Sequence, residues 1–291
     1  MNLETPKKFQ MLVDQAQQVA LNFLRPISRK YDKAEHSYPK ELDMLASLLD
    51  GMNDGAPESA GASTAGKRGA QANEGIRNGS NMSTALGIIE MCYGDTGLLL
   101  SMPRQGLGNS AIAAVANDEQ LERFMGKWAA MAITEPGTGS DSANIRTSAT
   151  RDGDDFILNG EKIYVTSGER ADCVVVWATL DRNLGRAAIK SFVVEKGTPG
   201  MTVTRLEHKL GIKASDTAAI NFTDCRVPVA NLLGNPEIDV GKGFAGVMET
   251  FDNTRPLVAA MAVGCAKASL ERTKELLKDY LDPNYSTLPL N

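Results

Sequence analysis

The chain has 291 residues, enough for two or more domains, and its 42% hydrophobic and 23% charged residues are ordinary for a globular protein. Its formal net charge of -5 and sequence pI of 5.3 argue against a nucleic-acid-binding protein, which needs a basic surface. No apolar run approaches the roughly 18 residues that a membrane-spanning helix needs. Residues 1–5 lack the basic and apolar regions that begin a signal peptide, so we expect a cytoplasmic protein.

Cysteine and histidine are too few and too scattered to indicate a metal site. The four cysteines form no C-x-x-C pair and predict reduced thiols: Cys92, Cys173, Cys225 and Cys265. His36 and His208 stand outside any H-E-x-x-H pattern, and an ordinary surface or structural histidine is the preferred interpretation of each. We therefore expect no metal, and we expect a cofactor to supply the chemistry.

The first part of the chain has helical periodicity. Apolar residues from Phe9 to Phe23 recur at spacings of three and four, and Pro26 is expected just beyond the end of this helix. A second helix is predicted over residues 39–49. Residues 51–81 are rich in Gly, Ala, Ser and Asn, which predicts a long loop or a partly disordered segment.

Helical spacing returns at Ser83 and continues, with interruptions, to residue 116. Asn117 is predicted to begin a further helix, with Leu121 and Phe124 on its apolar face. We therefore expect everything before residue 131 to be helical or loop.

At Met131 the pattern changes to that of strands. The Asn159-Gly160 pair separates two short β-prone runs and predicts a hairpin turn. Further strands are predicted at residues 173–178, 189–195, 201–205 and 218–222. Several strands with no helix between them predict an antiparallel barrel or sandwich.

Helix is predicted to return near residue 244 and to continue over residues 257–280. The chain is therefore expected to have an α+β fold with segregated domains. We predict an N-terminal all-α domain (1–130), a middle antiparallel β-barrel or sandwich domain (131–236) and the first part of a C-terminal helical bundle (237–291).

The loop after the first predicted strand is the most informative segment. The apolar run stops at Pro136, and Gly137, Gly139 and Ser140 follow. Small residues let a backbone approach a planar or phosphorylated ligand, whose oxygens hydroxyl and N–H groups can bond. A dinucleotide fingerprint is disfavoured because Ser142 stands where that motif needs a third glycine.

Five motifs, taken together, carry a resemblance to a known family. They are T-E-P-x-x-G-S-D at 134–141, N-G-x-K at 159–162, an aromatic strand motif at 163–168, K-x-G-x-x-x-S-x-T at 209–217 and F-D-N-T-R-P at 251–256. In order and spacing they resemble the acyl-CoA dehydrogenases, and the resemblance extends from about residue 5 to about residue 280.

The resemblance implies that FAD lies against the β-domain. Thr134 would bond the pyrimidine end of the flavin, Thr166 would bond near N5, and Tyr164 would pack beside the ring. Gly139 belongs to the same cofactor loop, and Ser140 would reach the flavin diphosphate or the substrate's phosphopantetheine. A flavin needs such donors and an aromatic wall, although strand propensity alone would also explain Tyr164 and Thr166.

Asp252 and Arg255 resemble the region of the family that meets the adenosine 3'-phosphate of CoA. Because Arg255 precedes Pro256, we predict it at a helix start, where a guanidinium suits a phosphate. A surface salt bridge between Arg255 and Asp252 at helical spacing is the alternative.

The reaction that the resemblance implies is the α,β-dehydrogenation of an acyl-CoA, with hydride transfer to flavin N5. An electron-transfer flavoprotein would accept the electrons, and the protein would be a homo- or hetero-oligomer, a dimer or tetramer. The family's base is commonly a Glu of the C-terminal domain, which we expect beyond residue 291. Thr254 stands where some members place the base, and it cannot abstract a proton; Glu249 is an alternative. We expect the 291-residue chain alone to be inactive.

Two other departures leave the function open. The family's R-x-x-F-G motif is absent from residues 280–291, and residues 51–81 replace a compact P-E-x-x-G-G loop. One alternative is therefore a non-catalytic or partly catalytic subunit of a heteromeric acyl-CoA dehydrogenase, and another is an acyl-CoA oxidase. The length and branching of the acyl group cannot be predicted, because dispersed apolar residues line the tail pocket.

Overall fold

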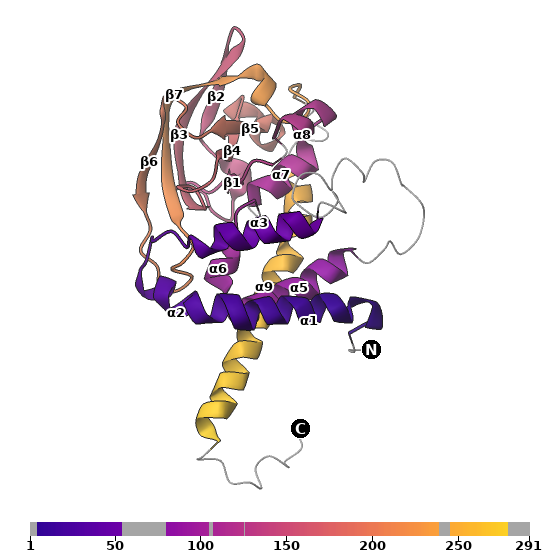
Figure 1. The fold of residues 1–291 in the computed structure, drawn as a ribbon. Helices are drawn as coiled ribbons and strands as arrows, with labels where there is room; N and C mark the ends of the chain where they lie inside the picture. Colours follow the sequence, from indigo (N-terminus) through magenta and orange to yellow (C-terminus); the bar gives the residue numbers. More distant parts are fainter. Residues whose placement is uncertain (1–4, 54–79, 105–106, 125, 239–244, 279–291) are drawn as a thin grey trace. The chain divides into compact units, whose positions relative to one another are not determined.

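The computed structural model describes residues 5–53, 80–104, 107–124, 126–238 and 245–278. Two compact units make up the chain, and each draws on segments that are far apart in the sequence (Figure 1). The helical unit contains Met1–Ser28, Arg77–Thr96 and Pro256–Asn291; the sheet unit contains Arg29–Ile76 and Gly97–Arg255. The division into three domains at residues 130/131 and 236/237 stays a prediction.

The N-terminal helix continues past the proline that was expected to end it. A 3-10 turn (Lys7–Phe9) leads into α1 (Gln10–Val19), a π-helical turn (Ala20–Leu24) and α2 (Arg25–Lys33). The prediction that Pro26 lies beyond the helix is therefore wrong. In the π turn the N–H of Arg25 donates to the carbonyl of Ala20, five residues back. This shift resets the hydrogen-bond register, so Pro26 becomes an early residue of α2, where its missing N–H costs little.

Small residues allow close helix packing in the helical unit, which also contains α5 (Ser80–Gly94) and the Pro256–Leu277 part of α9 (Ala245–Leu277). A Cβ atom on Gly94 would lie 2.8 Å from the carbonyl oxygen of Ala20. One on Gly264 would lie 2.2 Å from the carbonyl oxygen of Ile89. The π-helical turn at Ala20 and helix α9 can therefore both approach α5 closely, at Gly94 and Gly264 respectively.

The sheet unit has short helices beside its strands. They are α3 (Glu41–Asn53), α6 (Thr96–Leu100), α7 (Leu107–Val115) and α8 (Asp118–Phe124). The predicted helix start at Asn117 is confirmed by a reciprocal cap. The Gln120 N–H donates to Asn117 Oδ1 at 2.9 Å, and the Asn117 N–H donates to Gln120 Oε1 at 3.2 Å. Most of the predicted loop at 51–81 lies outside the described residues, and its ends belong to α3 and α5.

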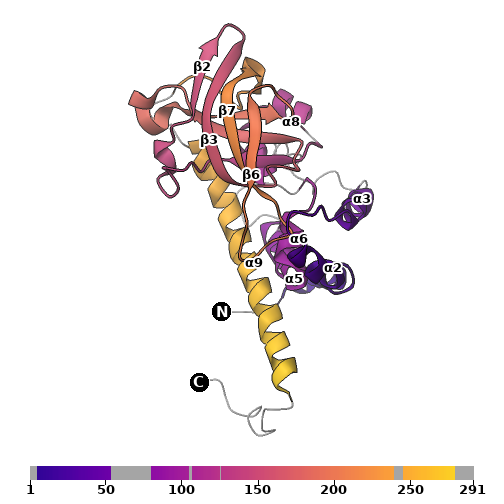
Figure 2. The same ribbon diagram turned by 90° about the vertical axis from the view of Figure 1, so that its left-hand side faces the viewer.

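Seven strands form one curled sheet, which Figure 2 shows with its long strands side by side. They are β1 (Ala129–Ala132), β2 (Ser148–Asp152), β3 (Asp155–Thr166), β4 (Cys173–Thr179), β5 (Ile189–Glu195), β6 (Met201–Leu206) and β7 (Thr217–Pro228). The spatial order is β1-β4-β2-β3-β7-β6, with β5 on β4. The α+β fold class is confirmed; the sheet is mixed rather than wholly antiparallel, because β1 and β2 each pair with β4 in parallel.

Strand β4 is buried on both faces, which explains its continuous apolar sequence. Alternate residues point to opposite sides of a strand. Val174 and Val176 contribute to one core cluster with Phe192, while Val175 and Trp177 contribute to a second cluster. The second cluster includes Ile112 of α7 and Phe124 of α8, so these helices cover that face of the sheet.

The hairpin predicted at Asn159-Gly160 is wrong. Strand β3 runs through this pair without a turn, and the chain reverses instead at Gly153, between β2 and β3. Gly160 lies at a shift in the register with β7, and a Cβ there would lie 2.5 Å from Thr147 Oγ1. The Asn159 amide bonds the Asp224 side chain and backbone. Asn-Gly therefore lies opposite a β-bulge at Thr223 and Asp224 of β7, in close backbone contact, and does not form a turn.

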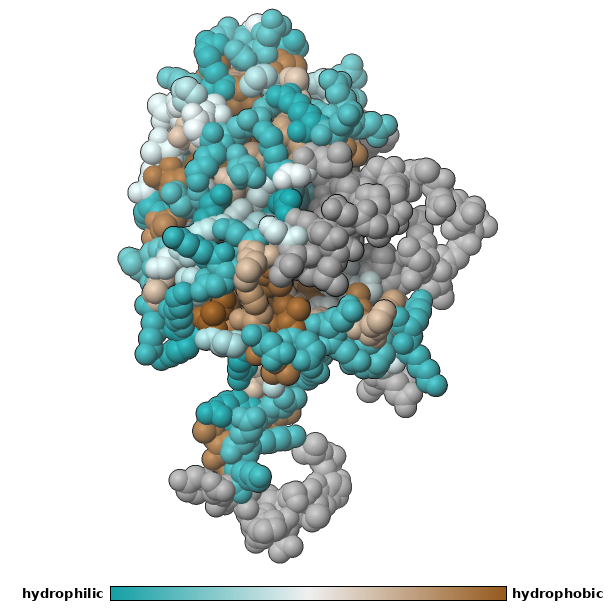
Figure 3. Space-filling view, viewed as in Figure 1, coloured by the Kyte–Doolittle hydropathy of each residue, from teal (hydrophilic) through white to brown (hydrophobic). Residues whose placement is uncertain are grey.

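The visible face of the strand-rich part is largely hydrophilic, with small hydrophobic groups between polar side chains (Figure 3). Within the described residues, no helix is both long enough and apolar enough to cross a membrane. Helix α9 has several exposed apolar side chains, namely Val258, Val263, Leu270, Leu276 and Leu277.

Candidate functional site

The loop after β1 is closed by its own backbone. The N–H of Glu135 donates to the carbonyl of Thr138 at 3.0 Å, and the N–H of Thr138 donates back at 3.1 Å. Gly137 and Gly139 are exposed, and a Cβ on either would meet nothing within 4 Å. Packing within the described chain therefore does not require glycine here. The open space beside the backbone is what a closely approaching ligand needs.

A buried ion pair fixes this loop to β3. The ammonium of Lys162 lies 2.8 Å from Glu135 Oε1, and it also donates to the carbonyl of Ile133 at 3.1 Å. The Lys162 side chain is fully buried, and that of Glu135 is 6% exposed. The Glu135 carboxylate also accepts from the N–H of Arg146 at 2.6 Å and from both the N–H and the hydroxyl of Thr147 at 2.8 and 2.6 Å. Each charge is thus paired and hydrogen-bonded, as a buried charge must be.

Burial and charge pairing act in opposite directions on this pair. Burial alone would raise the pKa of Glu135, but attraction to Lys162 and the accepted hydrogen bonds outweigh it and lower that pKa. For Lys162, burial outweighs the attraction to Glu135 and lowers the pKa to about 8. The two groups are therefore charged at neutral pH, and the ammonium is the member that burial disfavours.

The strand residues predicted to meet a flavin lie next to this loop. The N–H of Ile163 donates to the carbonyl of Thr134 at 2.9 Å, which joins the end of β1 to β3. Tyr164 lies at a register shift, has φ 58° and is 62% exposed. A bulky residue with positive φ costs on the order of 1–3 kcal/mol and often marks a functional position. Thr166, half-buried, pairs with Thr217.

The structure thus brings five predicted cofactor positions into one region, from the end of β1 to the end of β3. They are Thr134, Gly139, Ser140, Tyr164 and Thr166. Gly139 and Ser140 are exposed on the loop, and Thr134 and Thr166 are half-buried. An exposed aromatic ring, two partly accessible threonines and an open glycine loop fit the needs of a flavin.

The loop between β6 and β7 is anchored to the far end of β3. The N–H of Ser167 donates to the carbonyl of Asp216 at 3.0 Å, and the N–H of Glu169 donates to the Asp216 carboxylate at 2.8 Å. Lys209 donates to the carbonyl of Ser215 and to Thr217 Oγ1. Because Asp216 is itself buried, these bonds fix the segment that follows Thr166.

The predicted CoA residues lie on α9, and one prediction about them is wrong. The helix begins at Ala245, so Arg255 and Pro256 lie in its interior and not at a helix start. Arg255 is exposed on the side of the helix, away from the N-terminus of α9 at Ala245. The side chains of Asp252 and Glu249 lie outside the described ones, whereas Thr254 is buried. The roles of Asp252, Arg255 and Glu249 stay predictions.

A separate cleft of about 590 Å³ lies in the sheet unit. Its walls include His36, Arg104, Trp128 and Arg170. None of the five predicted flavin positions lines it. Its size alone does not make it the reaction site, because the open glycines and the exposed Tyr164 lie elsewhere.

The sequence motifs contained residues whose structural role was missed. Glu135 and Lys162 belong to the quoted motifs, yet no role was predicted for either. The burial of Lys162 could have been predicted from the sequence. Every second residue of a strand points to the same side, and Lys162 lies an even number of positions from Phe156 and Leu158, which point into the core. A lysine at an inward position requires a buried partner.

Comparison with known proteins agrees with this architecture. The family model described as "Acyl-CoA dehydrogenase, middle domain" matches residues 130–225. An acryloyl-CoA reductase (NADH) from Anaerotignum propionicum is 31% identical over 285 residues, covering 93% of this chain and 66% of that protein. The mitochondrial short-chain specific acyl-CoA dehydrogenase of Rattus norvegicus is 34% identical over 277 residues, covering 93% and 63%.

A solved structure shares the fold. Butyryl-CoA dehydrogenase from Megasphaera elsdenii superposes with a TM-score of 0.76 at 29% identity, covering 97% of this chain and 72% of that one. The chain thus spans about two thirds of the length of the curated relatives that it matches.

Proposed function

Because the chain belongs to the acyl-CoA dehydrogenase family, we propose that it binds FAD and takes part in the α,β-dehydrogenation of an acyl-CoA thioester. The observation that carries this proposal is the open glycine loop at Gly137 and Gly139 beside the exposed, positive-φ Tyr164. The β-bulge at this position accounts for the backbone conformation of Tyr164. The described packing requires neither the glycines of the loop nor the exposure of the Tyr164 ring, and a planar ligand against the loop would account for both.

The chain's own residues would hold the cofactor by its edges and one face. Thr134 and Thr166 offer hydroxyls to the polar edge of the ring, and Tyr164 supplies an aromatic wall. Gly139 leaves room for the backbone to approach, and Ser140 offers a hydroxyl to a phosphate. When bound, FAD supplies the acceptor for the β-hydrogen, which leaves the substrate as hydride. The buried Glu135–Lys162 pair acts indirectly, because it keeps the loop and β3 together.

Substrate binding would use the same loop and α9. Ser140 would donate to the phosphopantetheine chain, and Arg255 and Asp252 would bind the CoA nucleotide. Arg255 would act as an exposed cation on the side of the helix, where a guanidinium can contact a phosphate in bidentate fashion.

The α-proton would be removed by a carboxylate. Thr254 is a buried hydroxyl and cannot serve at neutral pH. We place the base on a glutamate outside residues 1–291, with Glu249 as the alternative within them. On this proposal the 291-residue chain binds FAD but has negligible dehydrogenase activity by itself.

A non-catalytic or partly catalytic subunit of a heteromeric dehydrogenase is the second candidate. The exposed apolar residues of α9 favour assembly with further helical structure, which such a subunit requires. We propose a homo- or hetero-oligomer in a cytoplasmic setting, with an electron-transfer flavoprotein as acceptor. An acyl-CoA oxidase would instead return the electrons to dioxygen.

A flavin titration tests the proposal. The full chain, and the whole protein that contains it, are titrated with FAD while the visible spectrum and flavin fluorescence are recorded. Saturable binding that Thr166→Val weakens supports the proposal. Folded protein that takes up no FAD in either form contradicts it. Bleaching of the bound flavin by acyl-CoAs, without air, then identifies the reaction; rapid recolouring in air identifies an oxidase.

A further inference from the structure

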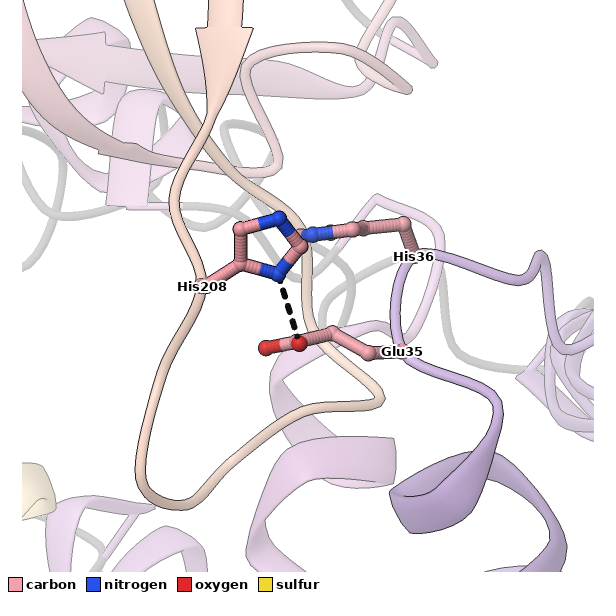
Figure 4. Close-up of side chains that lie close together, drawn as sticks. All are labelled: Glu35, His36 and His208. Carbon is pink, nitrogen blue, oxygen red and sulfur yellow. Dashed lines mark hydrogen bonds and ion pairs between the residues drawn. The ribbon is translucent and has the colours of Figure 1, made fainter.

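The chain has only two histidines, and the fold places them against each other. The rings of His36 and His208 have centroids 5.1 Å apart with an interplanar angle of 61°. The carboxylate of Glu35 lies 3.0 Å from His208 Nδ1, so three side chains that can bind a metal converge at one place (Figure 4). All three belong to the sheet unit.

Two segments supply this group. Glu35 and His36 lie in the turn between α2 and α3, and His208 follows β6. His36 has φ 68°, a conformation that histidine tolerates better than most residues but that still costs free energy. The second carboxylate oxygen of Glu35 accepts from the N–H of Lys209 at 2.8 Å. The carboxylate is therefore held in place from the His208 side of the group.

The imidazole of His36 lacks hydrogen bonds to the residues that the structure describes. Both of its ring nitrogens are buried, and neither has a hydrogen-bond partner among the residues that the structure describes. A buried polar group left without a partner costs about 1–3 kcal/mol, and an ion or water is a common explanation. The Glu35–His208 contact gives polar atoms of those two residues a partner, but it does not give the ring nitrogens of His36 one.

We propose that Glu35, His36 and His208 bind a divalent transition-metal ion, with Zn²⁺ as the representative ion. Two imidazoles and one carboxylate are a common ligand set for Zn²⁺, and three protein ligands leave a position for water. The candidate ligand atoms all lie within 4.8 Å of one another. Ligand atoms around a tetrahedral Zn²⁺ are separated by roughly 3.3 Å, which follows from bonds of about 2.0–2.1 Å. The His208 side chain is 85% exposed, so it can turn to close this difference.

Local charge is compatible with a metal. The carboxylate of Glu35 would supply negative charge beside the two imidazoles, and it also accepts a hydrogen bond from the backbone N–H of Lys209. A bound ion would join the turn before α3 to the loop after β6. Its effect would therefore be to fix the β6–β7 connection, which carries the Lys209–Thr217 segment.

Zinc binding to the untagged full chain tests this proposal. Isothermal titration with Zn²⁺ at slightly alkaline pH, where imidazoles are neutral, should give one site. His208→Ala should weaken that site at least tenfold, and because His208 is exposed, this variant should fold normally. Since no other histidine exists, the imidazole ¹H NMR signals of His36 and His208 should both move in proportion to one equivalent of Zn²⁺.

Two control variants test whether exposed side chains elsewhere in the chain bind the zinc ion. Cys265 is an exposed thiol and Glu119 an exposed carboxylate, so Cys265→Ser and Glu119→Gln should both retain the site. A rise in Tm with Zn²⁺ that His208→Ala abolishes would agree with the proposal. The proposal is overturned if no stoichiometric binding occurs. It is also overturned if His208→Ala, or a His36→Ala variant that folds, binds Zn²⁺ with the wild-type affinity.

Discussion

The ammonium of Lys162 and the carboxylate of Glu135 form an ion pair at 2.8 Å with almost no exposure to solvent. Lys162 lies on β3, and Glu135 lies in the loop after β1, two strands that are not neighbours in the sheet order. The pair therefore links the open glycine loop to the strand that carries Tyr164 and Thr166. Since both charges are buried, loss of the ion pair should affect both the stability of the sheet unit and the proposed flavin-binding region.

Removal of the Lys162 ammonium should destabilise the sheet unit strongly. Lys162→Met leaves the Glu135 carboxylate buried without its cation, and we expect a loss of about 3–5 kcal/mol in the free energy of unfolding by urea. Lys127→Met is the matched control, because Lys127 pairs with Glu195 at 2.9 Å but is 34% exposed. That pair should contribute about 0–1 kcal/mol. Equal losses in the two variants would contradict this account.

A methyl group at residue 160 should not fit. The Cβ of Gly160→Ala would lie 2.7 Å from Thr147 Cα, which is backbone and cannot turn away. We expect a destabilisation of about 1–3 kcal/mol. Gly137→Ala, where the new atom meets nothing within 4 Å, should leave stability within about 0.5 kcal/mol of the wild type. Thermal unfolding of both variants measures the difference.

Acid should weaken the fold in part through Glu35. The hydrogen bond with His208 and the backbone N–H of Lys209 hold the pKa of Glu35 at about 2 in the folded protein, against an ordinary value of 4.5 for glutamate. The unfolded chain therefore binds more protons between these pH values, so stability is complete above pH 4.5 and falls as the pH approaches 2. The free energy of unfolding by urea is measured at several pH values with a chelator present. For Glu35→Gln it should be lower than for the wild type near neutral pH, and the two values should become equal near pH 2. A constant difference across this range would disprove the assignment.

A side chain at residue 139 should affect the ligand and not the fold. In Gly139→Val the new side chain enters space that the described residues leave open. We expect a Tm close to that of the wild type and FAD binding at least tenfold weaker. Unchanged FAD affinity would place the flavin away from this loop.

Arg255→Ala should weaken binding of the CoA ester more than binding of FAD. Loss of a charge-assisted contact costs about 1.5–3 kcal/mol, or roughly 10- to 100-fold in the dissociation constant. Spectral titration of the flavin-loaded protein with an acyl-CoA measures this effect. If the CoA ester dissociates with the wild-type constant, Arg255 does not bind the nucleotide.

Local sequence patterns predicted the strands whose side chains are mostly buried and apolar. Strand β4 was found within a residue because nearly every side chain from Cys173 onward is apolar. Strand β2 was missed, because Ala149 is its one buried residue. The Asn159-Gly160 error has a tertiary cause, since the glycine is required by Thr147 and the asparagine by Asp224. No local pattern contains those contacts.

The residues of the candidate site could be proposed from the sequence where motifs contain them, and could not be proposed where only the tertiary fold brings them together. The loop around Gly139 and the strand around Tyr164 were identified from motifs, and their proximity is a finding of the structure. Arg255 was misplaced because Pro256 suggested a helix start, whereas α9 accommodates that proline in its interior. The meeting of His36 with His208 depends on tertiary structure alone.

The helical unit consists of three segments that are far apart in the sequence, and this fixes the order in which its contacts can form during synthesis. Every strand that the structure describes has been made before the ribosome reaches Gly264 and Lys267, two residues of α9 that contact α5. The sheet can therefore form while α5 still lacks α9 and Glu90 still lacks its lysine. The nascent chain must pass through a stage in which α5 lacks its contacts with α9 at Ile89, Glu90 and Cys92. This stage is where we expect chaperones to bind and truncated products to aggregate.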